Sequence, residues 1–232
     1  MPSERILVIE DEADLREVMA YNLRREGYKV ATAADGADGV RGAKESKPDL
    51  ILLDLMLPDL DGLEVCRRVR QDAELAKTPI IMVTAKGEET DVIVGLGVGA
   101  DDYVRKPFSV KELVARVGAV LRRGAHEGED ESLRALRRGP IEIDPGRHEV
   151  TVDGESVRFT ATEFRLLHFL AKRPGRVYER ETLLRRVLGD DAFHVERNID
   201  VHVRSIRKKL GERRDMIETV RGVGYKFRDT GR

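Results

Sequence analysis

The sequence predicts an α/β protein of two domains, a doubly wound, five-stranded parallel sheet followed by a smaller α+β domain. Short apolar runs alternate with amphipathic segments through residues 1–123, and a charged stretch poor in large apolar residues covers 124–138. Strand patterns and three helical patterns then fill 139–232. We therefore expect a first domain over 1–123, a linker over 124–138 that is flexible at least in its first half, and a second domain over 139–232.

Five apolar runs in the first domain have the length of buried strands. Amphipathic patterns separate and follow them, and in the first of these Leu15, Val18, Met19 and Leu23 fall on one helical face. This alternation predicts a parallel sheet with helices on both faces and right-handed crossovers, so functional groups are expected at the carboxyl ends of the strands. The strand runs are 6–9, 28–33, 50–53, 80–83 and 103–104, and the helical segments are 14–27, 36–46, 62–70, 91–99 and 110–122.

The second domain is expected to begin with antiparallel strands and to end with a hairpin. Asp153 and Gly154 mark a turn between the first strands. Thr160 and Glu163 have the spacing of a capping box at the start of the first helix. The predicted strands cover 141–152 and 155–160, the second and third helices 180–188 and 195–210, and the hairpin 216–220 and 225–228 around a glycine-rich tip at 221–224.

Composition excludes several classes of protein. No run of about 18 apolar residues could span a membrane, and the N-terminus lacks the pattern of a secretory signal. The single cysteine, Cys66, favours a reducing compartment and a cytoplasmic protein, and the five histidines lack zinc-ligand spacing. Residues 1–123 carry a net charge of −4 and residues 139–232 one of +4, which is a weak indication that the second domain binds nucleic acid.

Ionisable and hydroxyl side chains stand at the carboxyl ends of the predicted strands. Glu10 and Asp11 follow the first strand, Asp54 the third and Thr84 the fourth, and Lys106 lies just past the fifth. Because parallel strands share one carboxyl edge, we expect these side chains to converge. Clustered carboxylates repel one another, and a divalent cation relieves that repulsion; oxygen ligands of this kind suit Mg²⁺.

This cluster predicts phosphoryl chemistry. An ionised Asp54 beside Mg²⁺ could attack an electrophilic phosphorus, while Lys106 and Thr84 would stabilise the phosphoryl oxygens. One alternative is that the acids are ordinary solvated loop residues. Another is a Mg²⁺-dependent phosphohydrolase of the haloacid dehalogenase type, but that class needs a second Asp two residues after the nucleophile, where this chain has Met56.

The last helix of the second domain and the hairpin after it are candidates for DNA binding. One helix face carries Ile199, Val203, Ile206 and Leu210 and is expected to be buried, whereas the opposite face is basic and fits a major groove. A merely solvated face would show the same pattern. Arg221 at the hairpin tip could enter a minor groove. The predicted DNA contacts are Arg197, Asn198, Val201, His202, Arg204, Ser205, Lys208, Thr219, Arg221 and Tyr225.

The first domain resembles the receivers of two-component response regulators. The matching motifs are VIEDE at 8–12, LLDLMLPDLDG at 52–62, MVTAK at 82–86 and GADDYVRKPF at 99–108. The resemblance implies that Asp54 accepts a phosphoryl group from a partner histidine kinase and that Thr84 and Tyr103 form a switch pair. It implies that Lys106 binds the phosphoryl group and precedes a cis Pro107. Mg²⁺ would be held by Glu10, Asp11, Asp54 and the Met56 carbonyl.

The second domain resembles the winged-helix output domain of OmpR/PhoB response regulators. The matching segments are 159–184, 197–210 and TVRGVGYKF at 219–227. This resemblance implies a transcription regulator that binds double-stranded DNA and whose loop 189–195 is a candidate contact with RNA polymerase. Some family members have Arg at the position of Ser205, so no target sequence carries over.

The resemblance also implies a homodimer that forms on phosphorylation. Its charge pairs would join Asp101 to Arg123 and Asp102 to Arg116. The family's third pair joins Glu112 to a basic residue where this chain has Val92, so Glu112 is expected to be left to water or to Lys111. We expect slow autodephosphorylation and no dedicated enzymatic activity; an orphan regulator that dimerises without phosphate is the alternative within this class.

Overall fold

A computed structural model describes residues 4–85, 95, 97–125, 135–188 and 197–229 of the chain. The chain divides into two compact units, residues 1–121 and 122–232, and each is described by itself. Within the residues that the structure describes, no helix is both long and apolar enough to cross a membrane.

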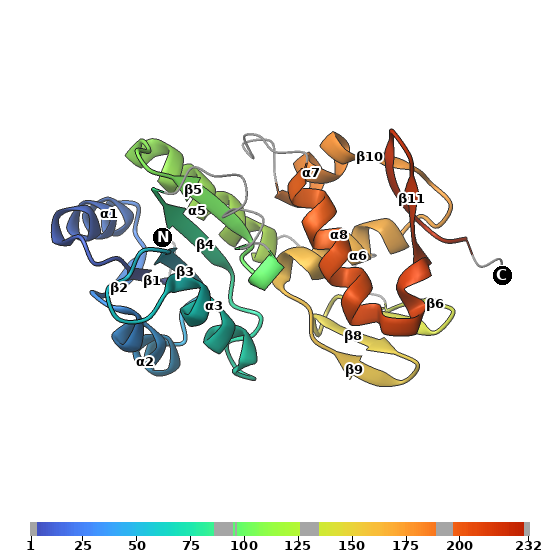
Figure 1. Ribbon diagram of the computed structural model, residues 1–232, viewed down its shortest axis with the longest axis horizontal. Coiled ribbons are helices and arrows are strands. Elements are labelled where there is room, and N and C mark those ends of the chain that lie inside the picture. The colour runs from blue at the N-terminus through green and yellow to red at the C-terminus, as the bar shows by residue number, and fades with distance from the viewer. Residues whose placement is uncertain (1–3, 86–94, 96, 126–134, 189–196, 230–232) are drawn as a thin grey trace. The chain divides into compact units, whose positions relative to one another are not determined.

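The first unit is a five-stranded parallel sheet, as predicted, and the structure gives the strand order β2-β1-β3-β4-β5. Helices α1 and α5 cover one face and α2 and α3 the other (Figure 1). The strands are β1 Arg5–Ile9, β2 Lys29–Ala33, β3 Leu50–Asp54, β4 Ile80–Thr84 and β5 Asp102–Arg105. The helices are α1 Ala13–Arg25, α2 Gly36–Ser46, α3 Gly62–Gln71 and α5 Val110–Ala125.

Burial explains why these segments form a covered sheet. Every residue of β3 and β4 is buried, as expected for central strands packed on both faces. On one face, Met19 and Leu23 of α1 and Val117 of α5 share a core with the strands. Of the helix predicted over 91–99, the structure describes residues 95 and 97–98 as helical, with Gly99 ending it at a φ of +119°; the rest lies outside the described residues.

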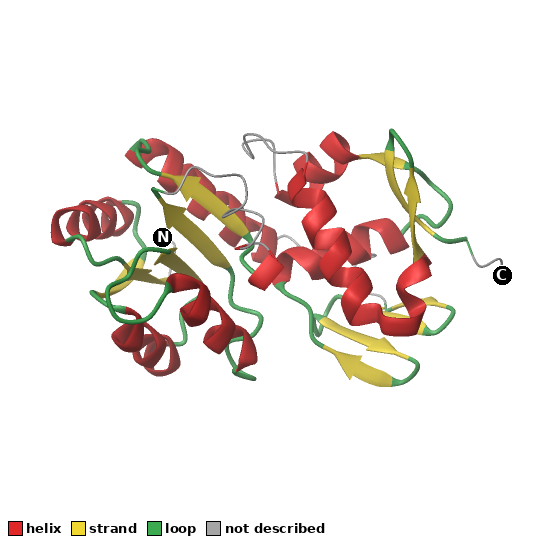
Figure 2. Cartoon of the chain, viewed as in Figure 1, coloured by secondary structure: helices red, strands yellow, loops and turns green. Residues whose placement is uncertain are grey.

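The second unit begins with a four-stranded antiparallel sheet and ends with a three-stranded one, β10-β12-β11, with helices between them (Figure 2). The first sheet contains β6 Leu136–Arg138, β7 Ile141–Asp144, β8 Glu149–Val152 and β9 Glu155–Val157. The helices are α6 Ala161–Ala171, α7 Arg180–Leu188, α8 Arg197–Leu210 and the 3-10 helix η1 Gly211–Met216. The second sheet contains β10 Tyr178–Glu179, β11 Ile217–Val220 and β12 Gly224–Phe227.

Two predictions about this unit are confirmed in detail. Thr160 and Glu163 form the capping box of α6, each side chain bonded to the other residue's backbone N–H. The apolar stripe of α8 is buried, with Ile199, Val203 and Ile206 at most 1% exposed. The winged-helix architecture therefore follows from the expected elements.

The predicted linker is too long at both ends. Helix α5 continues to Ala125, and residues 136–138 form β6, which pairs with β7. Leu136 packs against the core of the second unit and the Arg138 Nε donates to the Ala171 carbonyl at 2.9 Å, so this end belongs to the second domain. The strand expected over 141–152 is two strands, and the two-residue β10 was not predicted because so short a segment has no periodic pattern.

Candidate functional site

Three acidic side chains meet at the carboxyl edge of the parallel sheet. Glu10 follows β1 and Asp54 ends β3, and these strands are neighbours, so the two side chains lie side by side. Carboxylate oxygens of Glu10, Asp11 and Asp54 all lie within 4.8 Å of one another. Glu10 and Asp54 are buried, whereas Asp11 is exposed. The topology therefore produces the acidic cluster that the strand ends predicted.

Lys106 lies between the two buried acids. Its Nζ donates to Glu10 Oε1 at 2.8 Å and to Asp54 Oδ2 at 2.7 Å. Burial, reinforced by the Asp54 charge, raises the pKa of Glu10 to about 7 against the opposing hydrogen bond from Lys106. Burial also opposes the charge on Lys106, but its hydrogen bonds to Asp54 and Glu10 outweigh that effect and raise its pKa.

The cluster fits a hard divalent cation. Glu10 Oε2 is buried and has no hydrogen-bond partner among the residues that the structure describes. A buried carboxylate oxygen without a donor is costly, and a cation would satisfy it. The ligands on offer are all oxygens, which suits Mg²⁺ better than a thiophilic metal.

Thr84 and Tyr103 occupy the two strands beyond Asp54. Thr84 ends β4 and is 1% exposed, and its neighbour Val83 is in register with Asp54. Tyr103 lies on β5 in register with Met82 and is partly buried. The order of the strands thus places the predicted switch pair on the β4–β5 side of the acidic cluster. The Lys106–Pro107 peptide bond is cis, as predicted.

Two residues that the sequence did not single out hold the loops of this site. The Arg16 Nη1 donates to the carbonyls of Glu10 at 2.6 Å and Asp11 at 3.0 Å, so α1 fixes the backbone that carries both acids. Asp59 accepts hydrogen bonds from the Gly36 N–H at 2.8 Å and the Ala37 N–H at 3.0 Å. The Asp59 contacts join segments more than 20 residues apart, and the Arg16 contacts span five and six residues but follow no helical or strand period.

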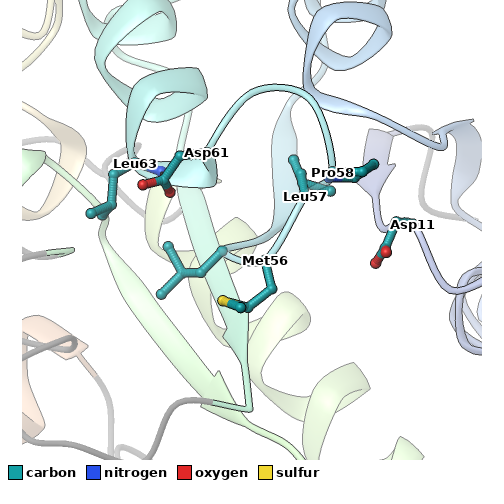
Figure 3. Close-up of a pocket in the computed structure, with 7 residues that line it drawn as sticks. Asp11, Met56, Leu57, Pro58, Asp61 and Leu63 are labelled. Carbon is teal, nitrogen blue, oxygen red and sulfur yellow. The ribbon is translucent and has the colours of Figure 1, made fainter.

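An open pocket of about 400 Å³ adjoins the acidic cluster. Met56 projects into this space from the loop after β3, and Asp11 faces it from the opposite side (Figure 3). The Met56 N–H donates to Asp54 Oδ1 at 2.9 Å, and the residue is 53% exposed. At Gly62 a Cβ atom would lie 2.2 Å from the Asp54 carbonyl oxygen, so only glycine lets α3 begin so close to β3. The lining residues are Asp11, Leu55, Met56, Leu57, Pro58, Asp61 and Leu63.

Asp101 does not fit the predicted dimer pair with Arg123. It is 1% exposed, and its Oδ2 accepts from Arg70 Nη2 at 2.8 Å and from the Ile80 N–H at 3.0 Å. Arg70 also donates to the Gly99 carbonyl at 2.9 Å. Asp101 is therefore bonded inside its own domain, and the sequence could not show this because Arg70 lies on a helix far along the chain. The side chain of Arg123 lies outside the described part.

Asp102, Glu112 and Arg116 form a cluster within one chain. Arg116 Nη1 lies 3.3 Å from Asp102 Oδ2, and Arg116 Nη2 lies 3.1 Å from Glu112 Oε1. The expectation that Glu112 is left to water or to Lys111 is wrong, because Arg116 stands one helical turn further on and reaches it. Residue 92 lies outside the described residues.

The outward face of α8 is smaller than predicted. Arg204 and Lys208 are exposed and Val201 is partly exposed. Ser205 donates to Glu163 Oε1 of α6, so its hydroxyl is turned toward the protein. His202 is 1% exposed, and this burial does not support the prediction that it contacts DNA. The sequence assigned His202 to the DNA-facing side although it lies beside the apolar stripe, one residue before Val203. Arg197 and Asn198 begin α8, but their side chains lie outside the description.

The hairpin after α8, residues 217–227, is called the wing. Arg221 is exposed at its tip, where Gly222 has a φ of +74° that favours glycine. Thr219 is exposed, but its Oγ1 accepts from Arg207 Nη2 at 2.8 Å. Tyr225 is 5% exposed, and burial followed by its hydrogen bond to Asp200 raises its pKa. Of the three wing residues predicted to contact DNA, Arg221 alone is exposed and makes no hydrogen bond or ion pair to the residues that the structure describes.

Both domains match known families of sequences. Residues 6–118 match the response regulator receiver domain, and residues 154–227 match the C-terminal domain of transcriptional regulatory proteins. The chain is 45% identical over 228 residues to the phosphate regulon transcriptional regulatory protein PhoB of Pseudomonas aeruginosa, covering 98% of each chain. It is 46% identical over 226 residues to the DNA-binding response regulator MtrA of Mycolicibacterium smegmatis, covering 96% of each.

Solved structures agree with this assignment. A mutant of RitR superposes with a TM-score of 0.79 at 27% identity, covering 98% of this chain and 100% of that one. The response regulator DrrB of Thermotoga maritima, an OmpR/PhoB homologue, has a TM-score of 0.51 at 31% identity, with coverage of 98% and 100%. The chain therefore belongs to the OmpR/PhoB family of response regulators, with an N-terminal receiver and a C-terminal winged-helix DNA-binding domain.

Proposed function

We propose that a sensor histidine kinase phosphorylates Asp54 and that this phosphorylation controls binding of the second domain to double-stranded DNA. The observation that carries the proposal is the convergence of Glu10, Asp11, Asp54 and Lys106 at one sheet edge. The relatives at 45–46% identity are named as transcription regulators and DNA-binding response regulators, which supports a regulatory output rather than a dedicated enzyme.

The chemical step follows from the position of Asp54. One of its carboxylate oxygens attacks the phosphorus of a phosphohistidine, the O–P bond forms, and the P–N bond breaks with its electron pair returning to the imidazole. Lys106, which already contacts Asp54, would move its hydrogen bond to a phosphoryl oxygen, and the Thr84 hydroxyl would bind another. Tyr103 would change its position together with Thr84, as the second residue of the switch pair.

Glu10, Asp11, Asp54 and the Met56 carbonyl would hold Mg²⁺. When bound, the ion supplies positive charge that offsets the carboxylates and the incoming phosphoryl oxygens. The Met56 N–H bonded to Asp54 Oδ1 already places the Met56 backbone beside the phosphoacceptor. The Arg16 contacts to the Glu10 and Asp11 carbonyls keep the other two ligands in place.

For the output, α8 would lie in a major groove with Arg204 and Lys208 outward, and Arg221 would reach a minor groove. Arg197, Asn198 and Val201 remain proposed contacts at the start of the same helix. A basic helix face and a cationic wing tip would supply phosphate contacts, so binding should weaken steeply as salt rises. We place the protein in the cytoplasm, where its DNA lies. Loop 189–195 remains a proposed contact with RNA polymerase.

We also propose that phosphorylation promotes a homodimer through the receiver. The Asp102–Glu112–Arg116 cluster supplies both charge signs on β5 and α5, so pairs could be exchanged between two copies. Asp101 is left out of this interface because Arg70 already binds it. The alternative is an orphan regulator that dimerises without phosphate, and the complete acidic cluster counts against it.

The decisive experiment compares Asp54→Asn with Asp61→Asn. The purified chains are incubated with Mg²⁺ and a small acyl-phosphate donor, and phosphoryl transfer is measured by intact mass. We expect wild type and Asp61→Asn to gain one phosphoryl group and Asp54→Asn to gain none, because the amide is no nucleophile. Asp61 lines the same pocket and caps α3, so it controls for local disturbance. Equal labelling of all three chains would refute the assignment.

Sedimentation and DNA affinity with and without a phosphoryl mimic then test the control itself. We expect a dimer and tighter DNA binding only when the mimic is present, and Arg116→Ala should weaken the dimer. Identical oligomeric state and affinity in both conditions would favour the orphan regulator. Autodephosphorylation is followed on the same labelled sample and should be slow.

A further inference from the structure

The wing is bonded to α8 by side chains that include Thr219 and Tyr225, two residues that the sequence predicts to contact DNA. Tyr225 lies on β12, and its hydroxyl donates to Asp200 Oδ1 on α8 at 2.8 Å. The same oxygen accepts from the Nε of Arg180, the first residue of α7, at 2.9 Å. One carboxylate oxygen therefore joins the two helices to a strand of the wing.

A second connection lies two helical turns further along α8. Arg207 donates to the Ile217 carbonyl of β11 through Nε at 3.1 Å and Nη2 at 2.7 Å, and to Thr219 Oγ1 at 2.8 Å. Residues 200 and 207 are seven positions apart, so they lie on the same side of the helix. Asp200 thus holds β12 while Arg207 holds β11.

The Tyr225 ring lies near both cations of this arrangement. The guanidinium carbons of Arg180 and Arg207 are 5.1 and 5.6 Å from its centroid, which is within the range of cation–π attraction. At Gly224, the residue before it, a Cβ would lie 2.0 Å from the Tyr178 carbonyl oxygen, so the strand is packed closely against β10. The base of the wing is therefore bonded to α8 on one side and packed against β10 on another.

We propose that Asp200, Arg207 and Tyr225 are positioning residues for DNA binding: they fix the wing relative to α8 so that Arg221 and the exposed Arg204 and Lys208 engage one duplex together. This inference rests on the proposed DNA-binding function. Wing-tip residues 221–223 are exposed, and their orientation depends on the bonded base of the hairpin. Fixing the base before binding removes an ordering cost that a free hairpin would meet on the DNA.

The negative charge of Asp200 distinguishes a positioning role from a direct electrostatic effect on DNA binding. Asp200 carries a negative charge on the helix proposed to meet DNA, so its removal should strengthen binding if charge alone mattered. A positioning role predicts the opposite sign, because Asp200→Ala frees Tyr225 and Arg180. Tyr225→Phe keeps the ring near both cations and removes only the hydroxyl, so it tests the same bond with little loss of packing.

The experiment measures affinity for a labelled duplex enriched from a random library by the wild-type full chain. Asp200→Ala and Tyr225→Phe are each made alone and together with Arg221→Ala. We expect each single variant to weaken binding by about three- to tenfold, the effect of one hydrogen bond. In the Arg221→Ala background the same changes should cost less than about twofold, because the residue they position is gone.

Arg207→Met and Arg207→Lys provide a second line of testing. Methionine removes all three hydrogen bonds to β11, and lysine can restore one of them, so partial rescue by lysine supports the proposal. Full additivity of Tyr225→Phe with Arg221→Ala would overturn it by making Tyr225 an independent contact. Asp200→Ala binding as tightly as wild type or more tightly would also overturn it. If the wild-type chain enriches no duplex, DNA binding itself is refuted. That outcome is distinct from those that overturn only the positioning role.

Discussion

The phosphorylation site and the DNA-binding surface hold their charged residues in different ways. At the acidic cluster, Glu10, Asp54 and Lys106 point toward one another and are largely buried. On α8 and the wing, Arg204 and Arg221 point outward, while Asp200 and Arg207 bind the protein itself. The first site gains its properties from side chains that converge, and the second from side chains that are kept apart and correctly oriented.

This difference decides what each substitution will reveal. Where side chains converge, one substitution changes the electrostatic environment of every neighbouring group, so its effect appears in the phosphoryl-transfer reaction. On an outward surface, substituting a contact residue and substituting a supporting residue both weaken DNA binding. Only the coupling between paired variants distinguishes the two roles. The buried Arg70–Asp101 ion pair shows that oppositely charged side chains also converge outside the phosphorylation site.

The largest effect should come from a buried pair whose role is structural. Arg70→Met leaves Asp101 buried without its cation, and we expect a loss of about 3–5 kcal/mol in the free energy of unfolding of the receiver. Arg67→Met, three residues earlier on α3, removes an exposed pair with Glu64 and should cost less than about 1 kcal/mol. Hydrogen exchange of β4 peptides in urea measures both. Equal losses would show that burial does not separate these two pairs.

Acid should weaken the second domain through His168. This side chain is 5% exposed, and burial, with a smaller contribution from Lys172, lowers its pKa to about 4 from 6.5. The folded state therefore binds this proton more weakly than the unfolded chain does. The contribution of His168 to the free energy of unfolding is full above pH 6.5 and is lost as the pH falls toward 4. The loss should approach about 3 kcal/mol at the lower end.

His168→Leu provides the control for this titration. In this variant, the part of the pH dependence between 6.5 and 4 that belongs to His168 should disappear. Thermal unfolding of both chains across that range gives the comparison. Curves that stay parallel would assign the acid sensitivity to other groups.

Arg221→Ala should lower DNA affinity by about tenfold, near the lower end for a specific groove contact. If Arg221 enters a minor groove, the loss should depend on A·T content; if it binds a phosphate, the salt dependence should become shallower. Lys208→Ala should weaken binding more evenly across sequences. Arg228→Ala, just past the opposite end of β12 and bonded to Glu218, serves as the control. Unchanged affinity in the first two variants would remove the helix-and-wing mode of binding.

The smallest effect concerns the lifetime of the phosphoryl group. Met56 projects into the pocket that Asp11 lines from the opposite side, and its thioether cannot hold a water molecule strongly (Figure 3). Met56→Asn offers an amide to an attacking water and should shorten the lifetime by about threefold, the effect of one modest hydrogen bond. Loss of label from the phosphorylated chain is followed over time. A lifetime equal to that of wild type would mean that water is positioned elsewhere.

Local patterns determined much of the fold. Helix α2 and helix α7 have the predicted bounds, and the capping box at Thr160 starts α6. The acidic cluster was also predictable, because parallel topology alone brings the ends of β1 and β3 together. The linker prediction was wrong at residues 136–138. A single apolar residue, Leu136, gives no detectable hydrophobic period there but still packs against the core of the second unit.

What the sequence by itself determined was therefore the set of residues at strand ends and on helix faces, since both follow from short repeats of 2 and 3.6 residues. Only the tertiary structure decided which partner each polar group takes. Asp101 binds Arg70, Ser205 binds Glu163 and Tyr225 binds Asp200. Each of these pairs spans at least 25 residues of chain. A hydrogen bond acts over about 3 Å of space, and only the packed fold sets that distance for residues so far apart in sequence.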